Sequence, residues 1–476
     1  MKILLVTGKI AEEVVRKYSA GCDVHVADVD VAAFITHRNL EGLDLSKYDL
    51  ILVPGLAKGK WREIEKKSGV NVRLGPVHAY DIPKVVELIE KIELSHTIPA
   101  DRLIEMEKER EILELIEREE RGVFDINGVQ IGGNSRMKVV AEIVDATEIG
   151  RDELLQRIEY YNECGADIID LGIPLSFSAD EVRRAIRIAR DECDALSIDT
   201  FSKKAMEIGV RHGIDMIMSI SSENLKALDV IDGQAVVVVE RDVEMLKCLV
   251  ELARAKTERV IADPVLEMRG LAESIGRYSA YRRIDPTTPT LFGVGNVTEL
   301  FDADSIGINA LLAYIGMEVR ADLLFTTEAS VKTGGSVMEL RRASYMAKGA
   351  EIRESPPKDL GITLLTLKEK FRYPEADMPE DFITAKRDDR FVRDPMGDFR
   401  IWISNGKIFC HHERAVVAGD DAKSILDTVL RLGLVSRLDH AGYLGRELKK
   451  AEIALKLGKN YIQDQPLKFG IYGDVS

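Results

Sequence analysis

Three short segments of the chain decide its fold: MKVVAEIVDA (residues 137–146), DIIDLGI (167–173) and ALSIDT (195–200). Each is a run of apolar residues rich in β-branched side chains, which is typical of a parallel strand buried on both faces. Between them lie RDELLQRIEYYNECG (151–165) and ADEVRRAIRIARDE (179–192), whose apolar residues have helical spacing. Strands and amphipathic helices therefore alternate from residue 137 onward.

The same alternation continues to about residue 350. Five further apolar segments follow: DMIMSIS (215–221), QAVVVVE (234–240), RVIADPV (259–265), TLFGVGN (290–296) and DLLFTTEAS (322–330). Eight strands, each followed by enough chain for one helix, span about 210 residues, which is close to the size of a (β/α)8 barrel. An open doubly wound sheet would show the same alternation, but eight regular units favour closure. We therefore predict an α/β protein built around a central TIM barrel.

The flanking segments differ from this pattern. Residues 1–95 alternate strand and helix signals, which predicts a small N-terminal α/β domain. Residues 96–136 contain a highly charged stretch with helical spacing and then a turn-rich sequence, which predicts a helical linker. The barrel is assigned to residues 137–350. Residues 351–476 are less regular and predict a C-terminal α+β domain.

Charge and hydropathy exclude several classes of function. The formal net charge of −15 argues against a large nucleic-acid surface, because binding phosphates requires clustered Lys and Arg. No stretch approaches the roughly 18 uncharged apolar residues of a membrane span. The opening MKILLVTGKI has the pattern of a buried strand and not of a secretory signal. We expect a cytoplasmic protein that acts on a small molecule, with no nucleic acid or membrane as partner.

Polar residues follow or end many of the predicted strands. The carboxyl ends of the strands build the active site of a (β/α)8 barrel, and burying carboxylates and amides there without partners is costly. This predicts a ligand rich in hydrogen-bond donors. A pterin fits, because its pyrimidinone edge presents an amino group and a ring N–H that one carboxylate can accept together. The residues concerned are Asp145, Asp199, Ser219, Glu240, Asp263, Asn296 and Glu328.

Part of the chain resembles a known family. GADIIDLG (165–172), LSIDTFSKKAMEIGVRHGIDMI (196–217) and VIADPV (260–265) are similar to strands of dihydropteroate synthases and of methyltetrahydrofolate:corrinoid methyltransferases, which share a pterin-binding TIM barrel. This indicates an archaeal-type relative of that family. The resemblance implies that Asp199 and Asp263 grip the pterin ring. An Asp at a strand end is also a common turn former or helix cap, but the joint occurrence on the third and sixth strands favours the functional interpretation.

Departures from the synthase pattern favour the methyltransferase branch. Synthases have an Asn in strand four and a Ser-Arg-Lys run after strand seven, where this chain has Met218 and Gly295-Asn296-Val297. Their loop NVTPDSF is replaced by VDATEIG (144–150), so the cation expected beside a diphosphate leaving group is missing. The segment around GVGNVTEL is similar to the methyltransferases, which implies that Asn296 hydrogen-bonds near the methyl-bearing pterin nitrogen. The alternative is an Asn that only caps the turn.

The resemblance implies binding of a reduced pterin, either tetrahydrofolate or tetrahydromethanopterin, and transfer of a methyl group from it. Asn296 would be the catalytic residue, and it would bind the pterin together with Asp145, Asp199, Ser219 and Asp263. The chain has no Asp-x-His-x-x-Gly motif for cobalt, so a corrinoid acceptor would arrive on a partner protein. Whether two copies of the chain form a homodimer is left open by the sequence.

Two other functions stay open: a divergent dihydropteroate synthase-like enzyme of pterin coenzyme biosynthesis, and a non-catalytic pterin-binding scaffold. No metal site is expected. Cys410, His411 and His412 are neighbours in a predicted strand, so their side chains alternate between faces and make a poor metal site. Arg282 and Arg283 could meet an anionic tail of the ligand or form a solvated basic face.

Overall fold

The computed structural model describes residues 1–358, 360–370, 378–379, 381–386 and 390–475. The chain divides into two compact units, Met1–Pro374 and Glu375–Ser476. The finer division predicted from the sequence, with boundaries at residues 95, 136 and 350, stays a prediction. None of the helices in the described ranges is long and apolar enough to cross a membrane.

The first sheet of the larger unit is a small parallel sheet in the order β2-β1-β3-β4. Its strands are β1 (Ile3–Thr7), β2 (Asp23–Val26), β3 (Leu50–Val53) and β4 (Asn71–Leu74), accompanied by α1 (Glu12–Lys17), α2 (Trp61–Ser68) and α3 (Ile82–Leu88). Successive side chains of β1 belong to two different apolar clusters, Leu4 and Val6 to one, Ile3 and Leu5 to the other. Both faces of this sheet are therefore buried, which explains the continuous apolar sequence of β1 and β3.

Helix α4 (Ala100–Glu119) links this sheet to the barrel. Ile104 near its start packs in the apolar cluster of the N-terminal sheet. Ile112 and Ile116, further along the helix, pack in a cluster with Ile362. The predicted helix of the linker is thus present, and its two ends belong to different cores.

A hairpin follows where the sequence indicated only turns. It consists of β5 (Phe124–Ile126) and β6 (Val129–Ile131), joined by Asn127 and Gly128 with φ values of +46° and +95°. Two residues with positive φ are the requirement of the tightest hairpin turn, and Asn-Gly is its preferred sequence. Strands of three residues are too short to show alternation, which is why the pattern of apolar residues missed them.

Eight parallel strands form the central barrel: β7 (Lys138–Ile143), β8 (Ile168–Gly172), β9 (Leu196–Asp199), β10 (Met216–Ile220), β11 (Ala235–Val239), β12 (Val260–Asp263), β13 (Leu291–Gly293) and β14 (Leu323–Thr327). Their order is β12-β11-β10-β9-β8-β7-β14-β13. The two end strands meet through a parallel bridge between Ala262 and Thr290, with the Ala262 N–H donating to the Pro289 carbonyl at 2.8 Å. The predicted closed barrel is confirmed.

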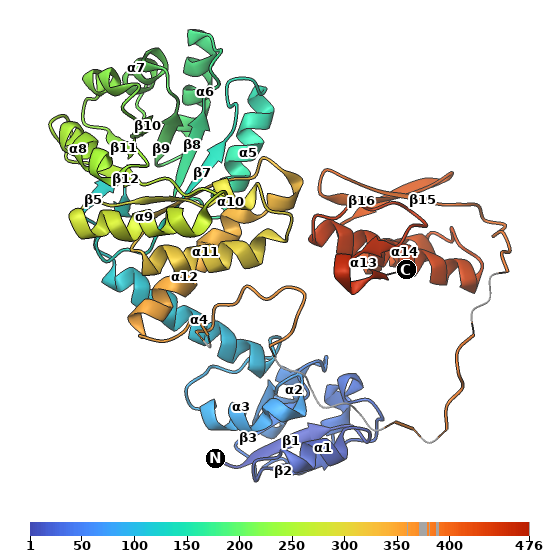
Figure 1. The fold of residues 1–476 in the computed structure, drawn as a ribbon. Helices are drawn as coiled ribbons and strands as arrows, with labels where there is room; N and C mark the ends of the chain where they lie inside the picture. Colours follow the sequence, from blue (N-terminus) through green and yellow to red (C-terminus); the bar gives the residue numbers. More distant parts are fainter. Residues whose placement is uncertain (359, 371–377, 380, 387–389, 476) are drawn as a thin grey trace. The chain divides into compact units, whose positions relative to one another are not determined.

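The helices of the barrel surround this sheet (Figure 1). They are α5 (Arg151–Glu163), α6 (Ala179–Glu192), α7 (Lys203–Arg211), α8 (Val243–Arg254), α9 (Leu271–Ile284), α10 (Gly295–Thr298), α11 (Ser305–Glu318) and α12 (Ser336–Ile352). Val139 and Ala141 of β7 pack in the cluster shared with the helices, whereas Val140 packs in the barrel interior. Ile126 and Ile131 of the hairpin join that interior cluster. The hairpin therefore covers one end of the barrel.

The smaller unit has the α+β character that the sequence predicted. Three antiparallel strands, β15 (Arg400–Ser404), β16 (Lys407–His412) and β17 (Ala415–Gly419), are accompanied by α13 (Ala422–Arg431), α14 (Leu438–Lys456) and the short pair β18 (Leu467–Lys468) and β19 (Asp474–Val475). His411 is exposed and His412 is buried, with its Nε2 2.7 Å from the Met396 carbonyl oxygen. The two imidazoles therefore lie on opposite faces of β16.

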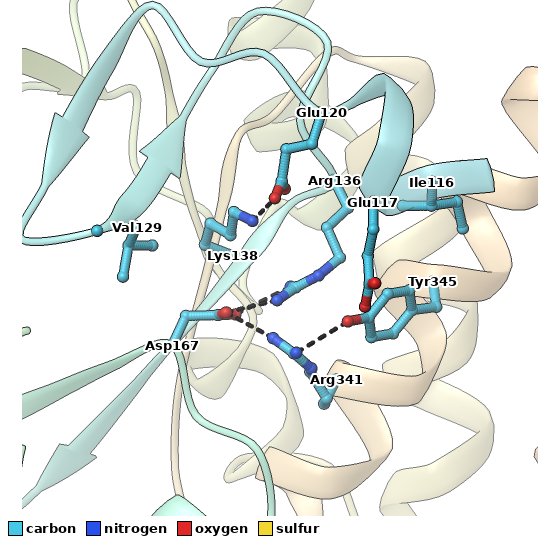
Figure 2. A pocket seen from close by; sticks show the side chains of 10 residues that line it. Ile116, Glu117, Glu120, Val129, Arg136, Lys138, Asp167, Arg341 and Tyr345 are labelled. Atoms are coloured by element: carbon cyan, nitrogen blue, oxygen red, sulfur yellow. Dashed lines mark hydrogen bonds and ion pairs between the residues drawn. The ribbon is translucent and has the colours of Figure 1, made fainter. Parts of the chain in front are cut away.

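A buried ionic cluster ties the start of the barrel to its last helix (Figure 2). The Asp167 carboxylate, just before β8, accepts hydrogen bonds from the guanidinium groups of Arg136 and Arg341 and from the Val139 N–H. Both guanidinium groups also lie over the ring of Tyr345. Only 4% of the Arg136 side chain and 10% of the Asp167 side chain are exposed. Removing one partner of such a cluster leaves charge buried without compensation.

We expect Asp167→Ala to lower the free energy of unfolding by about 3–5 kcal/mol, because two arginines lose their shared carboxylate. Glu153→Ala, which breaks an exposed ion pair with Arg157 one helical turn away, should cause no measurable change. Urea denaturation of both variants measures the difference. Equal stability of the two variants would contradict the structural role of Asp167.

Candidate functional site

Three carboxylates on neighbouring strands face the interior of the barrel near its carboxyl end. Glu142 of β7 lies opposite Asp170 of β8, and Asp199 of β9 lies opposite Gly172 of β8. Side chains two residues apart on a strand share a face, and Val140, two residues before Glu142, belongs to the interior cluster. Glu142, Asp170 and Asp199 therefore form part of one inner wall.

Asp199 and Ser219, two residues predicted from the sequence, are in direct contact. The Ser219 hydroxyl donates to Asp199 Oδ1 at 2.5 Å. Ser219 has a φ of +66° and lies where the pairing of β10 with β11 is irregular. The Asn224 amide donates to the Ser219 carbonyl at 3.0 Å and supports this conformation. The irregular backbone lets the hydroxyl of Ser219 reach the carboxylate on the neighbouring strand.

Asp263 ends β12 and is held rigidly. Its Oδ1 accepts the Val265 N–H at 2.8 Å and the Tyr278 hydroxyl at 3.1 Å, and 9% of the residue is exposed. Burial raises the pKa of Asp263 to about 6, although these two hydrogen bonds act in the opposite direction. The charge of Asp199 contributes to the raised pKa, so the two aspartates interact electrostatically.

Asp145 and Asn296 lie at the same end of the barrel but are exposed. Asp145 follows β7 with a φ of +51°, and its charge adds to the raised pKa of Glu142. Asn296 lies in α10, directly after β13, where its amide donates to the Leu266 carbonyl at 3.0 Å. A Cβ on Gly293 would lie 2.8 Å from the Asn296 Nδ2, so the glycine leaves room for this amide. The assignment of all five predicted residues to one ligand stays a prediction.

Other candidates from the sequence have different roles. Glu328 accepts the backbone N–H groups of Gly335 and Val337, both at 2.9 Å, and so stabilises the start of α12. Glu240 is half-buried after β11 and accepts the N–H of Arg241 at 2.8 Å. These two carboxylates have local backbone partners.

The proposal that Arg282 meets a ligand tail is wrong. Its guanidinium group donates to the Thr288 carbonyl at 2.6 Å and pairs with Asp322 at 2.5 Å. Thr288 and Asp322 precede β13 and β14, so Arg282 lies at the amino end of the barrel. Arg283 is exposed. The sequence suggested a ligand contact because these arginines lie between two predicted strands. In the structure, helix α9 carries them away from the carboxyl end of the barrel.

Sequence reasoning missed Glu142 and Asp170. Burial raises the pKa of Glu142 to about 7, with further contributions from the charges of Asp199 and Asp145. Asp170 is completely buried, accepts the Ser197 hydroxyl, and has a pKa well above its usual range because of burial and of its acidic neighbours. The available signal was an acidic residue inside an otherwise apolar strand. Such a cluster can accept hydrogen bonds, share protons or bind a cation.

A cavity of about 290 Å³ lies at the opposite end of the barrel, beside the ionic cluster of Figure 2. Its lining includes Arg136, Lys138, Asp167 and Arg341, which precede or start strands β7 and β8 or belong to α12. Lys138 pairs with Glu120, and both arginines pair with Asp167. These charges already have partners, and chemistry in this barrel class occurs at the carboxyl end of the strands. We therefore infer that the residues around this cavity contribute to stability and not to the functional site.

Comparisons with known proteins place the chain in a family. The family model PterinBD-DUF4346 matches residues 393–464, in the smaller unit. An uncharacterized protein of Methanocaldococcus jannaschii is 38% identical over 521 aligned residues, covering 98% of this chain and 98% of that protein.

Solved structures of dihydropteroate synthases also match part of the chain, with low sequence identities and low TM-scores. The enzyme from Vibrio fischeri has 15% identity and a TM-score of 0.38, covering 47% of this chain and 96% of that chain. The enzyme from Thermus thermophilus in complex with 6HMPPP has 17% identity and a TM-score of 0.38, covering 46% of this chain and 95% of that chain. The similarity to the archaeal protein, by contrast, extends over nearly the whole length of both chains. The chain therefore belongs to the family of this archaeal protein, and the match of PterinBD-DUF4346 to residues 393–464 agrees with the sequence resemblance to pterin-binding proteins.

Proposed function

We propose that the barrel binds a reduced pterin and transfers a one-carbon group, as methyl, from it to an acceptor carried by a partner protein. The observation that supports this most is the pair of aspartates at the ends of β9 and β12. Asp199 and Asp263 interact electrostatically at one end of the barrel and occupy the positions that the resemblance assigns to pterin recognition. The pterin is of the tetrahydrofolate or tetrahydromethanopterin type.

The carboxylate of Asp263 is suited to accept hydrogen bonds from two neighbouring donors of a ligand. The amino group and ring N–H of a pterin both need an acceptor, and a carboxylate offers two oxygens in a fixed geometry. The hydroxyl of Tyr278 and the amide of Val265 already hold this carboxylate in place. Binding would therefore require little reorganisation of the side chain, which favours affinity.

Asn296 would act near the pterin nitrogen that carries the methyl group. A tertiary amine is a poor leaving group until it is protonated, and a neutral amide stabilises the resulting cation without competing for the proton. In the transfer, the bond between nitrogen and methyl carbon breaks, the nitrogen keeps the electron pair, and the nucleophile of the acceptor forms the new bond to carbon. A reduced corrinoid on a partner protein is such a nucleophile.

The synthase alternative would require positive charge for a diphosphate leaving group. Arg277 and Arg241 lie near this end of the barrel, but both pair with Glu267, at 2.8 Å and 2.6 Å respectively. Their charge is already partly neutralised, which favours methyl transfer over diphosphate release. The scaffold alternative predicts pterin binding without turnover.

A calorimetric titration of the full chain distinguishes these functions. In buffer free of divalent cations, we expect methyl-tetrahydrofolate or methyl-tetrahydromethanopterin to bind more tightly than hydroxymethylpterin diphosphate, because this end of the barrel carries acidic side chains and the diphosphate is anionic. Tighter binding of the diphosphate would favour the synthase alternative. Binding of no pterin at all would contradict the proposed function.

Asp263→Asn should weaken pterin binding by about 2–4 kcal/mol, because an amide accepts only one of the two bonds and presents a donor to a donor. The matched control is Asp194→Asn, the same chemical change at an exposed residue just before β9, on the amino side of the barrel. The Asp194→Asn variant should bind the pterin with the same affinity as the unmodified chain. Unchanged affinity in Asp263→Asn, with an unchanged thermal melt, would reject the assignment.

The pH dependence of binding follows from the same carboxylate. The ligand-free pKa of Asp263 is about 6, and the pterin binds the ionised form, so a proton must leave before binding at lower pH. Affinity should therefore be constant above about pH 7 and fall by up to tenfold per pH unit below about pH 6. Asp263→Asn should lose this component. Titrations from roughly one pH unit below to roughly two units above this transition check the expectation. Identical pH profiles of the two proteins would contradict the role of Asp263.

A further inference from the structure

The carboxylates of Glu142, Asp170 and Asp199 form a compact cluster at the inner wall of the barrel. One oxygen of each lies within 4.8 Å of the corresponding oxygens of the other two. The residues belong to three adjacent strands, β7, β8 and β9, whose register places all three side chains toward the interior. Rigid strands, rather than a loop, therefore set the spacing of these oxygens.

No basic side chain neutralises this cluster within the described ranges. The ion pairs of the chain there involve none of the three residues, and the side-chain hydrogen bonds they accept come from the hydroxyl groups of Ser197 and Ser219. Hydroxyl groups satisfy single oxygens but bring no positive charge. Three negative charges at this distance in a buried setting require protons or a cation.

A second observation indicates a ligand. Asp170 is completely buried, and its Oδ2 has no hydrogen-bond partner in the part of the chain that the structure describes. Buried carboxylate oxygens nearly always have a partner, so an orphaned one indicates a missing group. Gly172 makes room for the Glu142 carboxylate, since a Cβ at position 172 would lie 2.6 Å from Glu142 Oε1. Only glycine lets the Glu142 carboxylate occupy this position on the inner wall.

We propose that Glu142, Asp170 and Asp199 bind a hard divalent cation of the Mg²⁺, Mn²⁺ or Ca²⁺ class. Carboxylate oxygens are the ligands that these ions prefer, and soft or nitrogen-preferring metals would select Cys or His instead. An upper separation of 4.8 Å is about twice a Ca²⁺–oxygen distance of roughly 2.4 Å, and a slight approach of the side chains would suit Mg²⁺ or Mn²⁺. Three protein oxygens leave coordination positions for water or for a substrate oxygen.

A cation here would add positive charge to an acidic end of the barrel. Asp199 belongs both to this cluster and to the proposed pterin site, so an ion would also orient the carboxylate on which pterin recognition depends. No metal-ligand pattern is visible along the chain, because 28 positions or more separate Glu142 from Asp170 and Asp170 from Asp199. Only the strand register brings them together.

Binding of Mn²⁺ to the full-length, EDTA-treated chain tests the proposal without any pterin. Free Mn²⁺ is followed by its paramagnetic resonance signal, and the same titration is repeated by calorimetry. We expect one saturable site that Mg²⁺ or Ca²⁺ displaces. Asp170→Asn and Glu142→Gln should each weaken Mn²⁺ binding by at least about tenfold, because affinity at such sites depends on ligand charge.

The matched control is Glu240→Gln, which removes a carboxylate at the same end of the barrel outside the cluster and should leave Mn²⁺ affinity unchanged. If Asp170→Asn does not fold, as judged by circular dichroism, Glu142→Gln still carries the test because its side chain is less buried. Absence of saturable Mn²⁺ binding, or equal loss in Glu240→Gln, would overturn the proposal and leave shared protons to neutralise the cluster. A pterin titration in the presence of EDTA separates failure of this site from failure of the proposed function.

Discussion

The hydrogen bond and bridge that join β12 to β13 close the parallel sheet, and the arrangement of both barrel ends depends on that closure. In a closed parallel sheet every strand points the same way, so all carboxyl ends meet in one ring, however far apart they lie in the sequence. Alternation along each strand then decides which side chains face the interior. Glu142, Asp170 and Asp263 follow inward-facing apolar residues by two positions, so all three face the interior at the same end, and Glu142 and Asp170 lie opposite each other on adjacent strands.

Buried charged side chains have different partners at the two ends of the barrel. At the amino end, Arg136 and Arg341 share Asp167, and Lys138 pairs with Glu120. Opposite charges in contact tolerate burial, and these pairs link Glu120, just after α4, and Arg341 of α12 to the barrel. At the carboxyl end, the buried carboxylates have hydroxyl and backbone partners and raised pKa values. Such an end is destabilising in isolation and is stabilised by whatever binds there, which is why we assign function to it.

Rigidity of this end comes from backbone features that cost conformational energy. Ser219 and Val265 have φ values of +66°, which a β-branched residue such as Val265 rarely adopts. The first orients a hydroxyl toward Asp199, and the second directs an amide toward Asp263. Backbone conformations of this kind persist where the surrounding structure imposes them, and they commonly occur at ligand sites. The fully buried ring of Tyr278 supports Asp263 from α9.

The sequence alone determined the barrel, because eight apolar strands at regular spacing are a local pattern that each segment carries by itself. It also singled out Asp199 and Asp263 as candidate pterin ligands, because they end their strands and resemble family positions; that role stays a prediction. The Asn127-Gly128 hairpin was also encoded locally, but its strands were too short for periodicity to show. The tertiary structure alone decided that Glu142 and Asp170 lie beside Asp199. Strand pairing and register create that contact, and neither is visible in a linear chain, because spacing along the sequence does not report which residues become neighbours across a sheet.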